Sequence, residues 1–205
     1  MNANQFLKAV EQLQGWRQYL FLVALAERGF PNFVLFSDAI GQKAGARMRV
    51  LLDSAWNLVN EKASEADLTR MLARLEQMSP SPEKYDSYGV HPAFDFCQLL
   101  EQALLDMLNP GRDRALDASR LATATVMSFI EFSEGEDLDE DELVRLLDHH
   151  PLMKADKAFQ RELVLSLKRQ RTPMESFVAD LQAQAADDGV SNLGIALDEG
   201  GEDEA

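Results

Sequence analysis

The chain has 205 residues, of which 46% are hydrophobic and 27% charged, a composition typical of a folded globular protein. Its one cysteine excludes an intramolecular disulfide framework and leaves no cysteine cluster for structural zinc. A formal net charge of −15 disfavours binding to nucleic acid or anionic membranes through a basic surface.

The negative charge is concentrated in two stretches. Residues 131–148 contain nine acidic residues and one basic residue, and residues 187–205 contain seven acidic residues and no basic one. Residues 197–205 are acidic and glycine-rich, which predicts a disordered tail after one helical domain over residues 1–196. A further hypothesis is that residues 131–148 form an acidic surface that mimics nucleic acid and binds a basic partner.

The N-terminus shows no basic segment followed by an apolar run and a small-residue cleavage site. The longest apolar run, Tyr19–Ala26, is far shorter than the roughly 20 residues that span a bilayer. We therefore expect a cytoplasmic protein in which this run forms part of a buried central helix.

Helical spacing of apolar residues dominates the N-terminal part. We expect a first helix from about Asn4 to Gly29, bent at Gly15. A second is expected over Phe30–Ile40, because Pro31 suits a first turn and Gly41 suits a helix stop.

A third helix is expected over Ala44–Asn60. The next begins after Ser64, because Ser64 and Asp67 have the spacing of a capping box. Its apolar stripe consists of Leu68, Met71, Leu72, Leu75 and Met78.

The helical period breaks at residues 79–92, which contain three prolines, one glycine and two tyrosines. Long internal loops carry function more often than the elements they connect, so this segment is of particular interest.

Helical signals then resume. Helices are expected over Pro92–Leu108, Arg112–Phe132 and Asp139–His149, with another beginning at Pro151. The last is expected after Thr172 as N-cap, with Pro173 in the first turn, and to end near Gly189. Since no alternating strand pattern is present, the sequence predicts an all-α protein, a single irregular bundle of about eight to nine helices.

Tyr88, His91 and Asp95 lie where the irregular segment enters a helix. His91 and Asp95 are one turn apart, and such a pair can bind a metal or transfer a proton. A metal site needs at least three protein ligands, and no other histidine is near in sequence. We therefore favour the structural interpretation, in which His91 caps the helix and Asp95 accepts hydrogen bonds from loop amides.

Glu27, Arg28 and Asn32 follow the apolar run at an expected turn. They can form a buried ion pair that lines a pocket, or they can be ordinary groups that satisfy the backbone at a helix end. We favour the second interpretation.

Asp53 lies three residues before Trp56, beside an apolar helix face. A carboxylate there needs a partner, such as Arg49 or the indole N–H of Trp56. The candidate pocket or binding residues are thus Glu27, Arg28, Asn32, Asp53, Trp56, Tyr88, His91 and Asp95.

The acidic stretch matches a calcium-binding EF-hand loop only in part. Asp137, Asp139 and Asp141 fit the first three oxygen positions, but Glu142 replaces the required glycine and Asp148 replaces the final glutamate. A loop that runs into a helix capped by Asp139 and Glu142 explains the same residues. Phosphate-loop, dinucleotide, zinc-protease and serine-hydrolase motifs are also absent from the sequence. We therefore expect no metal or cofactor and identify no catalytic residue.

Several short pieces stand in a distinctive order. They are Glu27-Arg28 with Pro31-Asn32 and Phe36, Leu52-Asp53 with Trp56, Tyr88-Gly89-Val90 with Pro92-Ala93, Asp95 and Cys97, and Ser191-Asn192 with Gly194-Ile195. Together, from about Phe6 to Leu197, they resemble the YjaG-like bacterial family, classed as a domain of unknown function. The resemblance implies an all-helical bacterial protein with no established activity, in which residues 191–195 are docked on the bundle.

The favoured function is that of a non-enzymatic helical protein that binds a protein partner or associates with itself. The alternative is an enzyme or small-ligand binder, and whether the chain is an enzyme stays open. That alternative requires side chains from separate helices to meet in one pocket. They are Glu27, Arg28, Asp53, Tyr88 and Asp95.

Overall fold

The computed structural model describes residues 1–61 and 63–197. Within them the chain forms nine α-helices and two 3₁₀ turns, and the β-pairing there is one isolated bridge between Val190 and Ala196. The all-α prediction is confirmed. Of the tail expected over residues 197–205, all but Leu197 lies outside the described residues.

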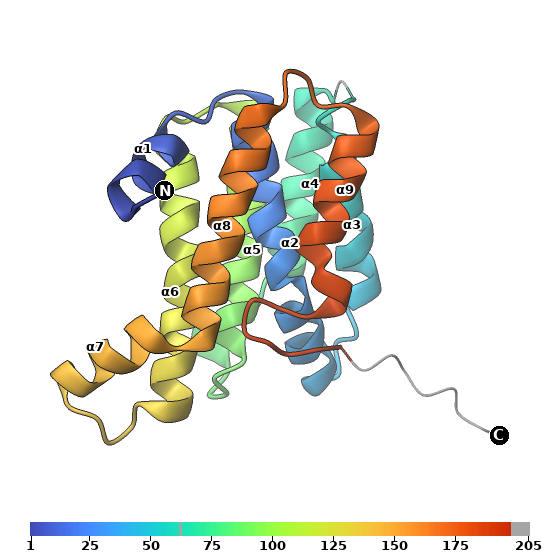
Figure 1. The fold of residues 1–205 in the computed structure, drawn as a ribbon. Helices are drawn as coiled ribbons and strands as arrows, with labels where there is room; N and C mark the ends of the chain where they lie inside the picture. Colours follow the sequence, from blue (N-terminus) through green and yellow to red (C-terminus); the bar gives the residue numbers. More distant parts are fainter. Residues whose placement is uncertain (62, 198–205) are drawn as a thin grey trace.

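Helices that follow one another in the sequence mostly run antiparallel (Figure 1). They are α1 (Ala3–Glu11), α2 (Trp16–Ala39), α3 (Gly45–Asn57), α4 (Glu65–Met78), η1 (Pro82–Lys84), α5 (Val90–Leu108), α6 (Arg114–Glu134), α7 (Glu140–His149), α8 (Pro151–Arg169), α9 (Glu175–Ala186) and η2 (Asp187–Gly189).

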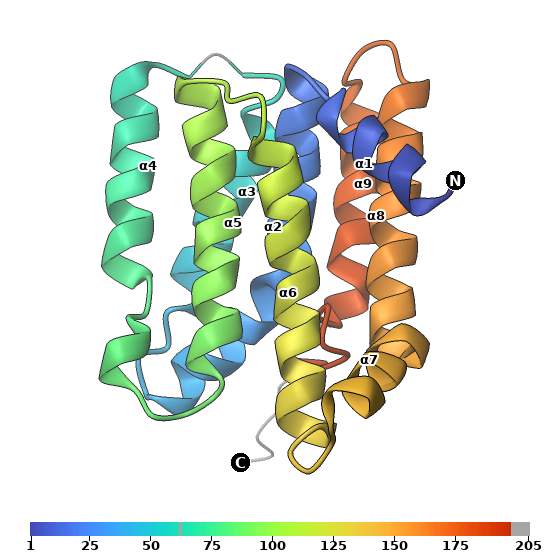
Figure 2. The same ribbon diagram turned by 90° about the vertical axis from the view of Figure 1, so that its left-hand side faces the viewer.

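Helix α2 lies in the middle of the bundle, with α3, α5, α6, α8 and α9 around it (Figures 1 and 2). Every side chain from Tyr19 to Ala26 is at most 3% exposed, so neighbours cover this helix on all sides. By length and composition α2 is the one described helix that could cross a membrane, but 78% of its most apolar 18-residue window is buried inside the bundle.

The predicted helix break at Gly29 and Pro31 is wrong, because α2 continues through both residues. A Cβ on Gly29 would lie 3.4 Å from the Cβ of Phe96, so this glycine lets α5 approach α2 rather than stopping the helix. The real break is at Gly15, whose φ of +57° separates α1 from α2 where one bent helix was expected. Gly41, with φ +73°, follows the end of α2 as predicted.

The capping signals at two helix starts are confirmed. Ser64 and Asp139 each accept a hydrogen bond from the backbone three residues later, and each box is closed by the reciprocal bond. The expected N-cap at Thr172 is wrong, and α9 begins at Glu175. The Thr172 carbonyl instead accepts a 3.0 Å hydrogen bond from Met174, which stays extended and so delays the helix.

A second, smaller apolar cluster lies apart from the main core, between α6, α8 and the C-terminal segment. It consists of Val126, Ile130, Met153 and Leu193. Ser191 and Leu193 are buried, and the Asn192 amide donates to the Arg28 carbonyl at 3.1 Å. The docking expected for residues 191–195 is therefore confirmed.

The central position of α2 gives a stability test. Leu22 is fully buried and Leu35, in the same helix, is 37% exposed. Leu22→Ala is expected to lower the free energy of unfolding by about 2–5 kcal/mol, because it leaves a cavity in the core. Leu35→Ala is expected to lower it by only about 1 kcal/mol, because this side chain is partly open to solvent and its removal leaves no enclosed cavity. Urea unfolding followed by circular dichroism measures both, and equal losses would contradict the arrangement.

Candidate functional site

The Glu27 carboxylate lies in the core of the bundle, with its side chain 3% exposed. Its Oε2 accepts hydrogen bonds from the indole Nε1 of Trp56 at 2.7 Å and from Nη2 of Arg49 at 2.9 Å, and Oε1 pairs with Nη1 of Arg49 at 2.5 Å. A buried carboxylate is tolerated only with partners of this kind. Three hydrogen bonds therefore attach α3 to α2.

Asp53 extends this cluster toward the surface. Its Oδ1 lies 2.7 Å from Nη2 of Arg49 and accepts a 3.3 Å hydrogen bond from Gln182 of α9. Of the two partners expected for Asp53, Arg49 binds it, whereas the Trp56 indole binds Glu27 instead. Burial lowers the pKa of Arg49, but the hydrogen bonds and charges of the two carboxylates outweigh it, and the net shift is upward.

Arg28 and Asn32 hold the C-terminal segment. The Arg28 guanidinium lies 4.7 Å above the ring of Phe159 and 3.0 Å from the Asp187 carboxylate. The backbone carbonyl of Arg28 accepts a hydrogen bond from the backbone N–H of Asn192. One turn later, the Asn32 side chain donates to that of Asn192 at 2.9 Å. These two candidates thus bind the docked C-terminal segment and do not line an open site.

Tyr88, His91 and Asp95 lie beside α6. The Tyr88 ring stacks on Phe132 at a centroid distance of 4.0 Å, and the His91 ring is 5.9 Å from Tyr88. Asp95 accepts a 2.8 Å hydrogen bond from the Thr125 hydroxyl, where loop amides were expected as donors. Burial raises the pKa of Tyr88 to about 12, and burial likewise raises the pKa of Asp95.

The irregular segment and the start of α5 meet α2 through aromatic rings rather than polar groups. The ring centroids of Phe30 and Phe33 lie 5.9 and 5.4 Å from that of Phe96. The ring centroid of Phe36 lies 5.1 Å from that of Tyr85. The eight candidates consequently form three groups that hydrogen-bond to separate neighbours. Across the residues that the structure describes, no group of three or more histidine, cysteine or acidic side chains is placed to hold a metal ion.

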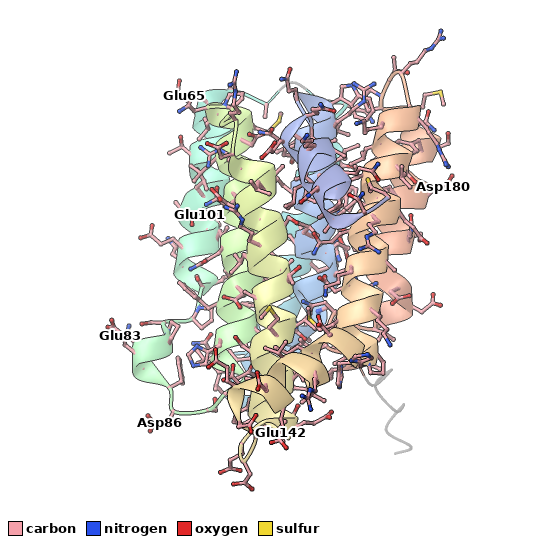
Figure 3. The ribbon with its side chains drawn as sticks, turned by 60° about the vertical axis from the view of Figure 1, so that its left-hand side comes forward. Glu65, Glu83, Asp86, Glu101, Glu142 and Asp180 are labelled. Atoms are coloured by element: carbon pink, nitrogen blue, oxygen red, sulfur yellow. The ribbon has the colours of Figure 1, made fainter. Side chains whose placement is uncertain are left out.

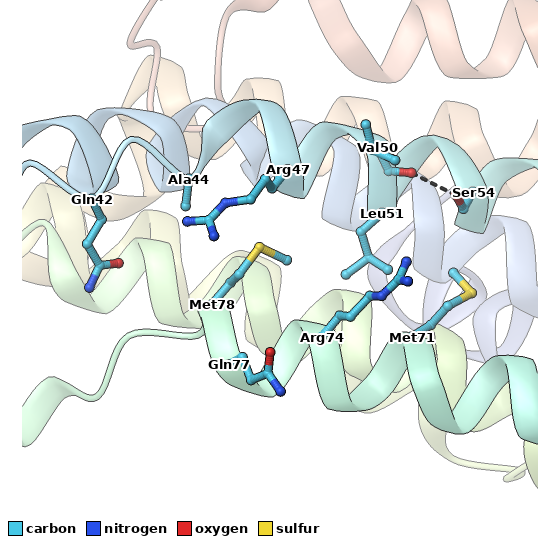
Figure 4. A pocket seen from close by; sticks show the side chains of 10 residues that line it. All are labelled: Gln42, Ala44, Arg47, Val50, Leu51, Ser54, Met71, Arg74, Gln77 and Met78. Atoms are coloured by element: carbon cyan, nitrogen blue, oxygen red, sulfur yellow. Dashed lines mark hydrogen bonds between the residues drawn. The ribbon is translucent and has the colours of Figure 1, made fainter.

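A groove between α3 and α4, not anticipated from the sequence, has a volume of about 650 Å³ (Figure 4). Its lining residues are Gln42, Ala44, Arg47, Val50, Leu51, Ser54, Met71, Arg74, Gln77 and Met78. This volume falls within the roughly 300–1,000 Å³ typical of ligand sites.

The groove combines apolar side chains with two cations. Val50 is 65% exposed, and Met71 and Met78 are half-buried. Arg47 reaches from α3 and Arg74 from α4 into the space between the helices (Figure 4). Methionine is flexible and polarizable, and it is common on surfaces that receive other helices.

Neither groove arginine has a carboxylate partner within the described part of the chain, where the salt bridges of α3 and α4 use Arg49 and Arg70. The groove lining contains no acidic residue. Exposed carboxylates lie on several other parts of the surface in the view of Figure 3. Those labelled in the figure are Glu65, Glu83, Asp86, Glu101, Glu142 and Asp180. The groove is thus a cationic exception on a strongly acidic protein.

Sequence reasoning missed the groove because it assigned one apolar stripe of α4 to the core. Leu68 and Leu75 are indeed buried at 4% and 3% exposure, but Met71 and Met78 lie at the edge of that stripe and line the groove. The available signal was the pair of methionines that lie one turn before and one turn after Arg74, whose charge has no acidic partner at helical spacing.

The environment of Asp95 predicts a pH effect. Its pKa is raised in the folded state, so ionisation there costs stability at neutral pH, and the cost disappears as pH falls through the folded pKa toward the ordinary value of 3.8. An asparagine can accept the same Thr125 hydrogen bond without the charge. Asp95→Asn is therefore expected to be more stable than the unaltered protein at pH 7, with a smaller difference near pH 4. Urea unfolding at both pH values measures this, and a constant difference would contradict it.

Comparison with known proteins places the chain among relatives of similar length. The family model described as "Protein of unknown function (DUF416)" matches residues 5–196. "Uncharacterized protein YjaG" of Escherichia coli K12 is 26% identical over 187 residues, which cover 91% of this chain and 93% of that protein. An uncharacterized protein of Haemophilus influenzae is 27% identical, over 94% of this chain and 97% of that protein.

A solved structure shares the fold. The crystal structure of a DUF416 family protein from Shewanella baltica OS155 is similar with a TM-score of 0.84 and 26% identity, and the match covers 94% of this chain and 98% of that one. The family match over residues 5–196 agrees with the YjaG-like resemblance that the sequence carries. The chain belongs to the DUF416 family of proteins of unknown function.

Proposed function

We propose that this chain is a non-enzymatic, cytoplasmic binding protein that holds an acidic amphipathic helix of a partner protein in the groove between α3 and α4. The observation that supports it most is the pair of unpaired arginines in a groove whose lining is half apolar and contains no acidic side chain.

The spacing of the groove residues suits a helical occupant. Arg47, Val50 and Ser54 recur along α3, and Met71, Arg74 and Met78 recur along α4, each at helical intervals over two turns. Two parallel walls of this kind form a trough that receives the apolar face of a third helix. Two turns correspond to a contact about 11 Å long.

Charge restricts the class of partner. Arginine binds carboxylates through two parallel hydrogen bonds, and Arg47 and Arg74 have these donors available. A basic segment would be attracted to the acidic surface elsewhere, but the two arginines would repel it from this groove. The groove therefore favours an acidic helix, although the net negative charge of the whole protein favours basic partners.

The rival hypothesis, an enzyme or small-ligand pocket, receives less support. Four of its five residues bind structural partners: Glu27 and Asp53 bind Arg49, Arg28 binds Asp187, and Asp95 binds Thr125. The fifth, Tyr88, stacks on Phe132.

Site-specific photo-crosslinking tests the proposal. A photoreactive benzoylphenylalanine at Gln77, which lines the groove, is expected to capture a partner in the native cells, and mass spectrometry should map the crosslink to an acidic amphipathic helix. Arg47→Gln with Arg74→Gln is expected to reduce the yield to about a tenth, because two ionic contacts are lost.

Two matched controls make the result specific. Arg169→Gln with Arg171→Gln removes the same charge from exposed positions outside the groove and should leave the yield unchanged. The same photoreactive residue at Ser128, exposed on α6, should not capture that helix. A crosslink to a basic or neutral segment, or to a second copy of the chain, would contradict the proposal.

A further inference from the structure

A second cleft, separate from the α3–α4 groove, is lined by residues of α1, α6 and α8. Figures 1 and 2 show where these three helices pack together in the bundle. Its volume is about 350 Å³, near the lower end of the range for small-molecule sites. This size fits one slender ligand rather than a second helix.

The wall between α1 and α6 is apolar. Phe6 and Leu7 contribute from α1, and Ala124 and Met127 contribute from α6. Leu7 is 38% exposed and Met127 is 39% exposed, so this apolar surface is accessible from solvent. Covering it removes apolar area from water, which is favourable at about 25 cal/mol per Å².

The opposite wall carries cations. Lys157 and Arg161 lie one turn apart on α8, both half-buried, and Arg120 faces them from α6. Arg120 is 3.5 Å from Asp117 in an exposed pair, whereas the described residues provide no carboxylate partner for Lys157 or Arg161. No acidic residue belongs to the cleft lining.

The floor is polar but already satisfied. Gln160, 1% exposed, accepts from Ser119 at 2.6 Å and donates to Thr123 at 3.0 Å and to Asp156. The Asp156 carboxylate is 4% exposed and also accepts from Thr123, so it lies behind these groups rather than in the cleft. A ligand therefore finds its ionic contacts at the α8 wall and not at the floor.

Helix α1 is attached in a way that suits a cover. Its second half is anchored by Ala9 and Val10, which are buried, while its first turns contribute Ala3, Phe6 and Leu7 to the cleft. Gly15, with φ +57°, connects α1 to α2 as a separate element. Half of the apolar wall thus comes from a short helix that is a separate element from α2, and the other half comes from α6.

We propose that this cleft binds a single free medium-chain fatty acid, with its alkyl chain between α1 and α6 and its carboxylate on Lys157 and Arg161. An apolar wall facing an unpaired cationic wall matches an amphiphile with one negative head. The small volume excludes the two chains and large headgroup of a phospholipid. This site is separate from the α3–α4 groove, so the two proposals stand or fall independently.

Isothermal titration of the full chain with dodecanoate, below its micelle concentration, tests the site. Saturable binding of one molecule per chain is expected. Lys157→Gln with Arg161→Gln should weaken it about tenfold, because two ionic contacts are removed. Lys154→Gln with Arg169→Gln removes the same charge from exposed positions of α8 outside the cleft and should not weaken it.

The apolar wall has its own matched pair. Met127 and Leu165 are 39% and 40% exposed, but only Met127 lines the cleft. Met127→Asp is expected to abolish dodecanoate binding and Leu165→Asp to preserve it, with circular dichroism melting to confirm that both variants fold. Three results would overturn the proposal: no saturable binding, equal binding of dodecyltrimethylammonium, or association with anionic lipid vesicles that survives the Lys157→Gln and Arg161→Gln changes.

Discussion

The buried Glu27 carboxylate is the constraint on which the arrangement around α2 depends. A charge at 3% exposure is tolerated only because Arg49 and Trp56 supply three hydrogen bonds, and both residues lie on α3. Because Arg49 also binds Asp53, which in turn accepts from Gln182 of α9, one carboxylate fixes three helices relative to one another.

This attachment determines what α3 can present to the outside. Arg49, Asp53 and Trp56 recur at intervals of four and three residues and face the core or its margin, so a different set of positions faces α4. That set carries Arg47 and Val50 into the groove. Helix α3 thus carries a buried ion pair on one side and an open surface on another, and the cationic character of that surface comes from Arg47, which the ion pair does not use, together with Arg74 of α4.

Much of the fold could be predicted from the sequence, because apolar stripes and capping boxes are local signals. Gly29 and Pro31 misled the prediction, since nothing near them reports that Phe96, far along the chain, needs the space of a missing side chain. Likewise Asp53 was correctly expected to need a partner, but the choice of Glu27 by the Trp56 indole depends on how α2 and α3 pack. The groove was missed because the edge of an apolar stripe looks the same as its centre until the neighbouring helices are placed.

The most direct test of the central claim is a double-mutant cycle on Glu27 and Arg49, with the free energy of urea unfolding measured for Glu27→Gln, Arg49→Gln and both together. We expect the sum of the two single losses in unfolding free energy to exceed the loss in the double variant by roughly 1–3 kcal/mol, because removing either side chain alone leaves the other uncompensated. Losses that add to within about 0.5 kcal/mol would show that the two side chains act independently, and would contradict the role given to this ion pair.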